Sequence, residues 1–225
     1  MKNLLAALLV TLIMTPVMAQ AVPAEIIILR HGEKANPYRL SRIGEERAEA
    51  LAKVYLGRDA SDSLLPKGTK PAALMTVTLH TIETMTPTAL SWGIPEMAYS
   101  VVPEWNLPKS DKKAEETRRT QEAAHALLHD PKYDGKIVIV MWEHQRIASA
   151  DLERQFPGQK VTFRQLLHLN RLPGVPKTWP KDTFDYFWIV RYRGNDPVPI
   201  SFSMRKELFH GPYGNLPQND WGKPE

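Results

Sequence analysis

The chain has 225 residues, a formal net charge of +4 and no cysteine. Without cysteine it can form no disulfide, no thiolate metal site and no cysteine nucleophile, and no lipid can be attached through an N-terminal cysteine. The basic residues are scattered among acidic ones. The sequence has no run of basic residues interleaved with aromatic ones, which is the pattern that indicates a nucleic-acid partner.

The start of the chain has the three parts of a secretory signal peptide. Lys2 supplies a positive charge, an apolar run covers residues 4–13, and small residues follow up to Ala21. The apolar run is shorter than the roughly 20 residues that cross a bilayer. We therefore expect residues 1–21 to be cleaved, the mature protein to be periplasmic or secreted, and no stable membrane anchor to remain.

The remaining residues, 22–225, are enough for a single domain with its own hydrophobic core. Within them, residues 205–225 are rich in Gly, Pro and Asn and are expected to form an irregular tail. The sequence thus predicts one domain after the signal peptide.

Short apolar runs alternate with amphipathic segments along this domain. Buried strands are predicted at 25–29, 72–78, 97–102 and 136–142, and helices after Ser41 and at 80–92, 112–128 and 145–155. Near the end, segments 184–193 and 197–204 flank Gly194-Asn195-Asp196 and predict an antiparallel hairpin. The alternation predicts an α/β fold: a three-layer, doubly wound, mostly parallel sheet with helices on both faces and the C-terminal hairpin at its edge.

Two of the predicted buried strands run directly into a histidine. One strand leads into Arg30-His31-Gly32, and the strand at 136–142 leads into His144. Ligands of open α/β sheets bind beyond the carboxyl ends of the strands. We therefore expect both imidazoles to face one crevice.

Four segments, in this order along the chain, resemble the histidine phosphatase superfamily, which includes the phosphoglycerate mutase-like proteins. They are the Arg-His-Gly triplet at 30–32, the Leu-Ser-x-x-Gly-x-x-Arg-Ala segment at 40–48, the helix start at 80–84, and the second-histidine strand at 138–147. The resemblance implies a metal-independent phosphomonoester hydrolase, here an exported bacterial-type member, that forms a phosphohistidine without a cofactor. Its partner would be a small-molecule phosphate ester or an envelope phosphate.

The chemistry also follows from the residue types. A neutral imidazole nitrogen can attack phosphorus in line and form a covalent phosphohistidine, which predicts His31 as the nucleophile. Negative charge then spreads over three equatorial oxygens of the transferred group. Arg30 and a protonated His144 can donate to those oxygens, while Gly32 allows backbone to approach them.

Two expected phosphate ligands depart from the pattern of the superfamily. His80 stands where the superfamily has a second phosphate-binding arginine, and histidine is charged only below its pKa and donates a single bond. This predicts reduced activity at neutral pH or an optimum shifted toward acid pH. If the correspondence is shifted by a few residues, Thr76 or Thr78 supplies polar contacts instead. Lys34 falls where relatives carry a further arginine, and is either a phosphate ligand or a solvated lysine.

The general acid that protonates the leaving oxygen has three candidates. Glu104 follows the third predicted strand, where the superfamily places its acid, and is the first choice. Glu33 and Glu143 compete because each is close to a catalytic histidine in the sequence. A second interpretation is a catalytically weak or inactive member that binds a phosphorylated ligand or partner, with His80 as a sign of decay.

Overall fold

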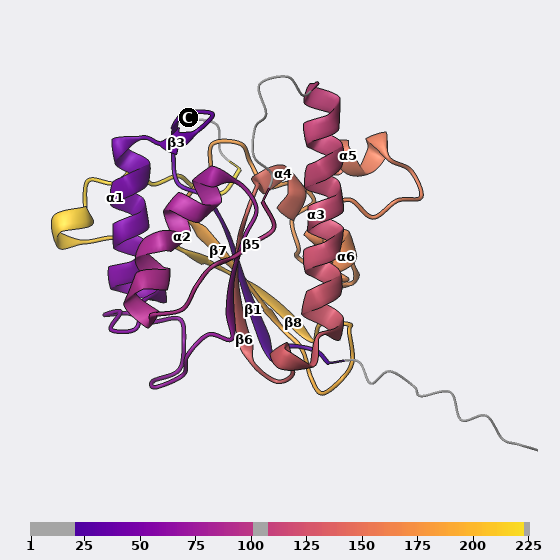
Figure 1. The fold of residues 1–225 in the computed structure, drawn as a ribbon, viewed down its shortest axis with the longest axis horizontal. Helices are drawn as coiled ribbons and strands as arrows, with labels where there is room; N and C mark the ends of the chain where they lie inside the picture. Colours follow the sequence, from indigo (N-terminus) through magenta and orange to yellow (C-terminus); the bar gives the residue numbers. More distant parts are fainter. Residues whose placement is uncertain (1–20, 101–107, 223–225) are drawn as a thin grey trace, which may run out of the picture.

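The structure is a computed structural model that describes residues 21–100 and 108–222. Within these residues, one six-stranded sheet has the order β5-β4-β6-β1-β7-β8 (Figure 1). Its strands are β1 (Glu25–Arg30), β4 (Ala73–Thr76), β5 (Met97–Ala98), β6 (Ile137–Trp142), β7 (Tyr186–Arg191) and β8 (Ser201–Lys206). A separate ribbon pairs β2 (Lys34–Asn36) with β3 (Arg39–Leu40).

The four strands from β5 to β1 run parallel to one another. Strand β7 pairs antiparallel with β1, and β8 pairs antiparallel with β7 at the edge of the sheet. The predicted α/β fold, with a mostly parallel sheet and a C-terminal hairpin at its edge, is confirmed.

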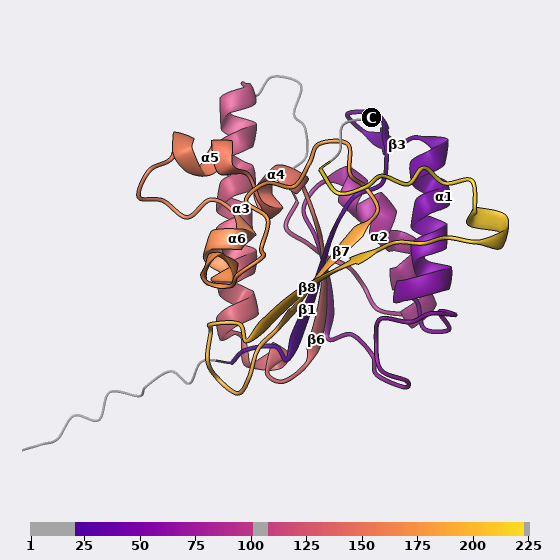
Figure 2. The ribbon, with the colours of Figure 1, turned by 180° about the vertical axis from the view of Figure 1, so that it is seen from behind.

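Helices cover both faces of the sheet (Figures 1 and 2). One face carries α1 (Arg42–Leu51), a π-helical turn that continues it (Ala52–Leu56), and α2 (Leu79–Trp92). The other face carries α3 (Lys109–His129), α4 (His144–Ile147), α5 (Ala150–Gln155) and α6 (Phe163–Leu166). Short 3₁₀ turns occur at Pro131–Tyr133, Leu169–Arg171 and Gly211–Tyr213.

The central strand β1 is buried along its whole length because it has a helical layer on each side. Ile26 and Ile28 pack into the core under α3, whereas Ile27 and Leu29 pack into the core under α1 and α2. Successive side chains of a strand point to opposite faces, so a strand covered on both sides reads as a continuous apolar run. Each fully buried side chain of this kind contributes roughly 1.5–3 kcal/mol.

The predicted helix at 145–155 is instead two helices, α4 and α5, with Ala148 and Ser149 extended between them. The Ala148 carbonyl accepts a hydrogen bond from the Trp179 amide at 3.0 Å, and the Ser149 hydroxyl caps α5 by accepting from the Leu152 amide at 3.2 Å. The break is therefore stabilised by a hydrogen bond from Trp179, a residue too far along the chain to enter the hydrophobic pattern of segment 145–155.

The hairpin is also shorter than predicted, since β7 ends at Arg191 and β8 begins at Ser201. Pro197 and Pro199 have no amide hydrogen to donate to the ladder, so the connection between the strands takes residues 192–200.

The structure describes most of the predicted C-terminal tail but almost none of the predicted signal peptide. Residues 205 and 206 belong to β8, so the irregular tail begins after them, and its Phe209 and Leu216 are buried beside α1. The predicted signal peptide, apart from Ala21, and the end of the third predicted strand lie outside the described residues. Among the described helices, none combines the length and apolar character needed to cross a membrane.

Candidate functional site

The two predicted histidines leave from neighbouring strands. Arg30, the last residue of β1, pairs in parallel register with Trp142, the last residue of β6. Beyond this edge, ligand atoms of His31, Glu143 and His144 all lie within 4.8 Å of one another. The expected convergence of His31 and His144 at the carboxyl edge of the sheet is therefore present.

His31 is buried, with 1% of its surface exposed, and its ring is held in one orientation. Its Nδ1 lies 2.6 Å from the Gly32 carbonyl oxygen, which can only accept, so Nδ1 carries the hydrogen. Burial lowers the pKa of His31, although the Glu143 carboxylate opposes this. The Nε2 lone pair is consequently unprotonated at neutral pH and faces the edge of the sheet, as a nucleophile requires.

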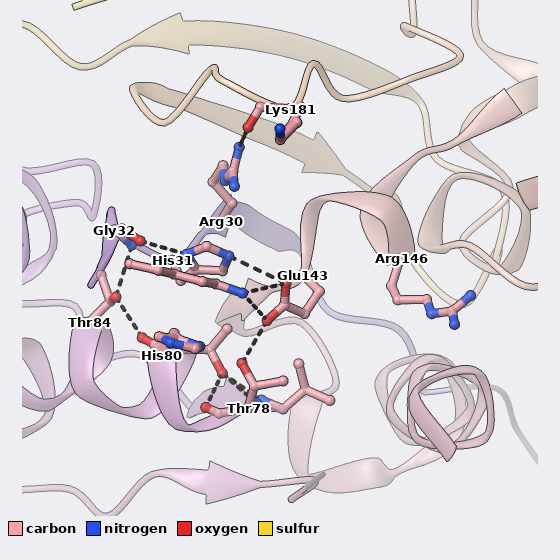
Figure 3. A network of polar contacts seen from close by, with 12 residues as sticks. Arg30, His31, Gly32, Thr78, His80, Thr84, Glu143, Arg146 and Lys181 are labelled. Carbon is pink, nitrogen blue, oxygen red and sulfur yellow. Dashed lines mark hydrogen bonds and ion pairs between the residues drawn. The ribbon is translucent and has the colours of Figure 1, made fainter. Parts of the chain in front are cut away.

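The carboxylate of Glu143 is the centre of the polar contacts at this edge (Figure 3). Its Oε1 accepts from the Lys34 ammonium at 3.1 Å and from the Thr78 hydroxyl at 2.8 Å, and its Oε2 lies 3.3 Å from His31 Nε2. Burial raises the pKa of Glu143, but His31 (whenever its ring is protonated), the Lys34 ammonium and the Thr78 hydroxyl hold it well below its usual value. Glu143 is therefore an anion at neutral pH.

His144 begins α4 directly after Glu143. Burial, together with the positive charge of Arg30, lowers the pKa of His144 to about 3. Its Nδ1 is buried and has no hydrogen-bond partner among the described residues. At neutral pH His144 is thus a neutral imidazole with one N–H, and not the protonated donor that the sequence suggested.

Arg30 is turned away from this cluster toward the loop before β7 (Figure 3). Its Nη1 donates to the carbonyl oxygens of Lys181 at 2.5 Å and Thr183 at 3.2 Å, and the guanidinium lies 3.8 Å from the Phe184 ring centroid. Burial lowers its pKa to about 10, which still leaves it charged. The predicted contact of Arg30 with phosphate is not preformed, because main-chain carbonyls already accept from one of its two terminal nitrogens, Nη1.

His80 lies beside His31, with their ring centroids 5.6 Å apart. Its Nε2 is bonded to the Asn36 carbonyl oxygen at 2.7 Å, so that nitrogen donates to backbone. Burial lowers the pKa of His80, which leaves it neutral at neutral pH. Of the alternatives open in the sequence, Thr78 contacts the central carboxylate, while His80 contributes a neutral ring to the same wall.

Gly32 serves backbone packing in the structure. A Cβ atom at Gly32 would lie 2.9 Å from the carbonyl oxygen of Gly44 in α1, closer than such contacts occur. The Gly32 amide donates to the Thr84 hydroxyl at 3.0 Å, which in turn donates to the His80 carbonyl at 2.7 Å. Glycine at residue 32 thus lets the segment after β1 pass close to α1, and the Gly32 amide already donates to Thr84.

The two candidate general acids that the structure describes, Glu33 and Glu143, have different partners. Glu33 accepts from Arg47 at 2.6 Å and 3.0 Å and so faces α1, which makes it a structural residue. Glu143 faces His31 directly. Glu104 lies outside the described residues, so its role stays a prediction.

Sequence reasoning gave Thr78 only as an alternative and did not foresee that Glu143 would gather Lys34 and Thr78. The signal for Thr78 was its position two residues after β4, which ends at the same edge as β1 and β6.

The imidazoles of His31 and His144 with the Glu143 carboxylate are also a donor set that a transition metal ion can use. The Lys34 ammonium on the same carboxylate makes the site more favourable for an anion.

The chain matches no known family model, and no curated protein is similar to it in sequence. Two solved structures resemble it distantly. Mycobacterial hydrolase 2 is 16% identical with a TM-score of 0.40, over 84% of this chain and 91% of that one. Mycobacterial hydrolase 1 is 15% identical with a TM-score of 0.36, over 84% of this chain and 99% of that one. At these values neither likeness indicates what the present chain does.

Proposed function

We propose that the protein is a phosphomonoester hydrolase that acts through a phosphohistidine on His31. The observation that carries this proposal is the orientation of His31. The Gly32 carbonyl fixes the hydrogen on Nδ1, so that the Nε2 lone pair points to a buried edge that also holds Lys34 and Thr78. A neutral nucleophile beside donors for negatively charged oxygens is the arrangement that phosphoryl transfer needs.

The reaction has two displacements. In the first, His31 Nε2 attacks phosphorus, the P–O bond of the ester breaks, and the leaving oxygen takes a proton from a general acid. In the second, water attacks the phosphohistidine, the P–N bond breaks, and inorganic phosphate leaves. Glu143 is ionised, so it suits the second step as acceptor of a proton from the attacking water. Glu104 stays the proposed acid of the first step.

The proposed mechanism uses no metal ion or cofactor, because the histidine supplies the nucleophile and protein donors supply the charge stabilisation. The proposed substrate is a small-molecule phosphate ester or an envelope phosphate in the periplasm or outside the cell. This location rests on the signal peptide predicted in residues 1–21.

A second candidate is a weakly active or inactive protein that binds a phosphorylated ligand or partner. Two observations favour it: Arg30 Nη1 is engaged by main-chain carbonyls, and Glu143 already sits among the anion donors. A binding protein, however, has no need of an unprotonated Nε2 such as that of His31, whose ring is oriented by the Gly32 carbonyl.

The test is turnover of p-nitrophenyl phosphate with and without a chelator, together with trapping of the phosphorylated protein by rapid quenching. We expect chelator-independent turnover and an acid-labile phosphate on wild type, and loss of both in His31→Ala. His125→Ala is the matched control, because His125 is exposed on α3, and it should keep full activity. Binding of phosphate without turnover would favour the second candidate.

A further inference from the structure

We propose that Lys34, Thr78 and His31 form the phosphate-binding subsite, and that the carboxylate of Glu143 occupies this subsite until a phosphate group displaces it. This deepens the proposed function, on which its catalytic meaning rests. It replaces Arg30 and His80 as the first contacts of the phosphate, and it makes Glu143 an internal competitor of the substrate.

Two donors of the subsite, Lys34 at the start of β2 and Thr78 just after β4, both bind the carboxylate of Glu143. The Lys34 ammonium lies 3.1 Å and 3.2 Å from the two oxygens of Glu143, and the Thr78 hydroxyl donates to Oε1 at 2.8 Å. Charge-assisted hydrogen bonds of this kind are the strong ones, and they serve phosphate oxygens as well as carboxylate oxygens. Any anion that binds at His31 therefore has to share or take these donors.

The contact between Glu143 and the nucleophile is a poor one. Because Nδ1 of His31 donates to the Gly32 carbonyl, Nε2 presents a lone pair, and the Glu143 oxygen 3.3 Å away is also an acceptor. No hydrogen lies between two acceptors, and Nε2 has no hydrogen-bond partner among the described residues. An electron-poor phosphorus at this place is attracted to the nitrogen, whereas a carboxylate oxygen is not.

Both partners of the central ion pair carry some solvent-exposed surface. The Lys34 side chain is 37% exposed and the Glu143 side chain is 13% exposed, so we infer that a small anion approaches from the side of Lys34. When a phosphate enters, Lys34 and Thr78 transfer their hydrogen bonds to its oxygens and keep a charged partner. Glu143 then loses these partners, and this cost reduces the apparent affinity for phosphate.

The decisive measurement is the affinity for inorganic phosphate by calorimetry. We expect Glu143→Ala to bind phosphate at least about tenfold more tightly than wild type, since the competitor is gone. Glu143→Gln, which keeps the shape without the charge, should lie between them. Adding Thr78→Val to Glu143→Ala should weaken binding by about tenfold, because a hydrogen bond to a charged oxygen is lost.

Glu116→Gln is the matched control. Glu116 is also a largely buried carboxylate near Glu143, but it pairs with Arg146 at 3.5 Å and contacts none of the subsite donors. Its removal should change phosphate affinity by less than about threefold, because only a distant charge is lost. Equal or weaker phosphate binding by both Glu143 variants, with thermal unfolding like wild type, would overturn the subsite.

Turnover separates this inference from the proposed function. Tighter phosphate binding by Glu143→Ala, together with no His31-dependent hydrolysis by the wild type, supports the subsite and refutes the enzyme. His31-dependent hydrolysis with no gain in affinity in Glu143→Ala refutes the subsite and supports the enzyme. If both hold, KM for p-nitrophenyl phosphate should fall in Glu143→Ala, with kcat lowered by loss of the proton acceptor.

Discussion

The guanidinium of Arg47 binds both oxygens of Glu33, with Nη2 2.6 Å from Oε1 and Nε 3.0 Å from Oε2. Arg47 also contacts Glu207 at 3.4 Å and donates to the Pro217 carbonyl at 2.8 Å. One buried side chain of α1 therefore ties the segment after His31 to the C-terminal tail.

Replacing this guanidinium should disturb both the fold and the site. Arg47→Lys keeps the charge but loses the bidentate geometry, so Glu33 and Glu207 lose partners in a buried place. We expect a loss of about 3–5 kcal/mol in the free energy of unfolding and a fall in kcat/KM of between about ten- and a hundredfold. Urea unfolding and aryl phosphate kinetics measure the two effects. Arg42→Lys, at a residue with an 86% exposed side chain, should change stability by less than about 0.5 kcal/mol.

The contact between α1 and the segment after β1 requires glycine at residue 44. A Cβ atom there would lie 2.3 Å from the Glu33 carbonyl oxygen, which is backbone and cannot move aside cheaply. We expect Gly44→Ala to lower stability by about 1–3 kcal/mol and to lower activity, because the backbone beside His31 shifts. Gly214→Ala is the control, because the nearest atom to a Cβ at Gly214 is the Gly211 carbonyl oxygen at 3.4 Å, an ordinary contact. Equal unfolding midpoints for the two variants would contradict the close approach.

Glu207 should make the protein less stable in alkali. Burial raises the pKa of Glu207 to about 8, above its ordinary value of 4.5. A raised folded pKa gives stability that is fully present below pH 4.5 and is lost as pH rises through 8. Relative to Glu207→Gln, wild type should lose roughly 3–5 kcal/mol between pH 5 and 9. Chemical unfolding at several pH values tests this, and parallel stability curves for the two proteins would refute it.

His144 should make the protein less stable in acid. Its pKa is lowered to about 3 from the usual 6.5. A depressed folded pKa gives stability that is present above pH 6.5 and is lost as pH falls toward 3. We expect His144→Asn to remove roughly 3–5 kcal/mol of this acid loss, leaving the part due to His31 and His80. His125→Asn, on the exposed side of α3, should change stability at neutral pH by less than about 0.5 kcal/mol.

His80 tests the expectation that a histidine replaces a phosphate-binding arginine. His80→Arg adds a permanent charge beside His31 and should raise activity at pH 7 by about three- to tenfold. His80→Gln adds no charge and should not raise it. If activity against pH is the same for wild type and His80→Arg, a side chain at residue 80 does not reach the phosphate.

The sequence indicated where the candidate site lies because strand ends are encoded locally. The apolar runs before His31 and His144 predicted two central parallel strands, and β1 and β6 are direct neighbours in the sheet. It did not predict the ribbon of β2 and β3 or the break between α4 and α5. Both depend on partners elsewhere in the chain, such as Trp179 for Ala148.

The sequence by itself determined the α/β sheet and the edge at which both histidines meet, because alternation and burial are properties of neighbouring residues. Only the tertiary structure decided where the polar side chains turn. Arg30 donates to carbonyls about 150 residues away in the chain, and Glu143 binds Lys34, 109 residues away. Such orientations follow from charges and hydrogen-bond acceptors that become neighbours only when the sheet has formed.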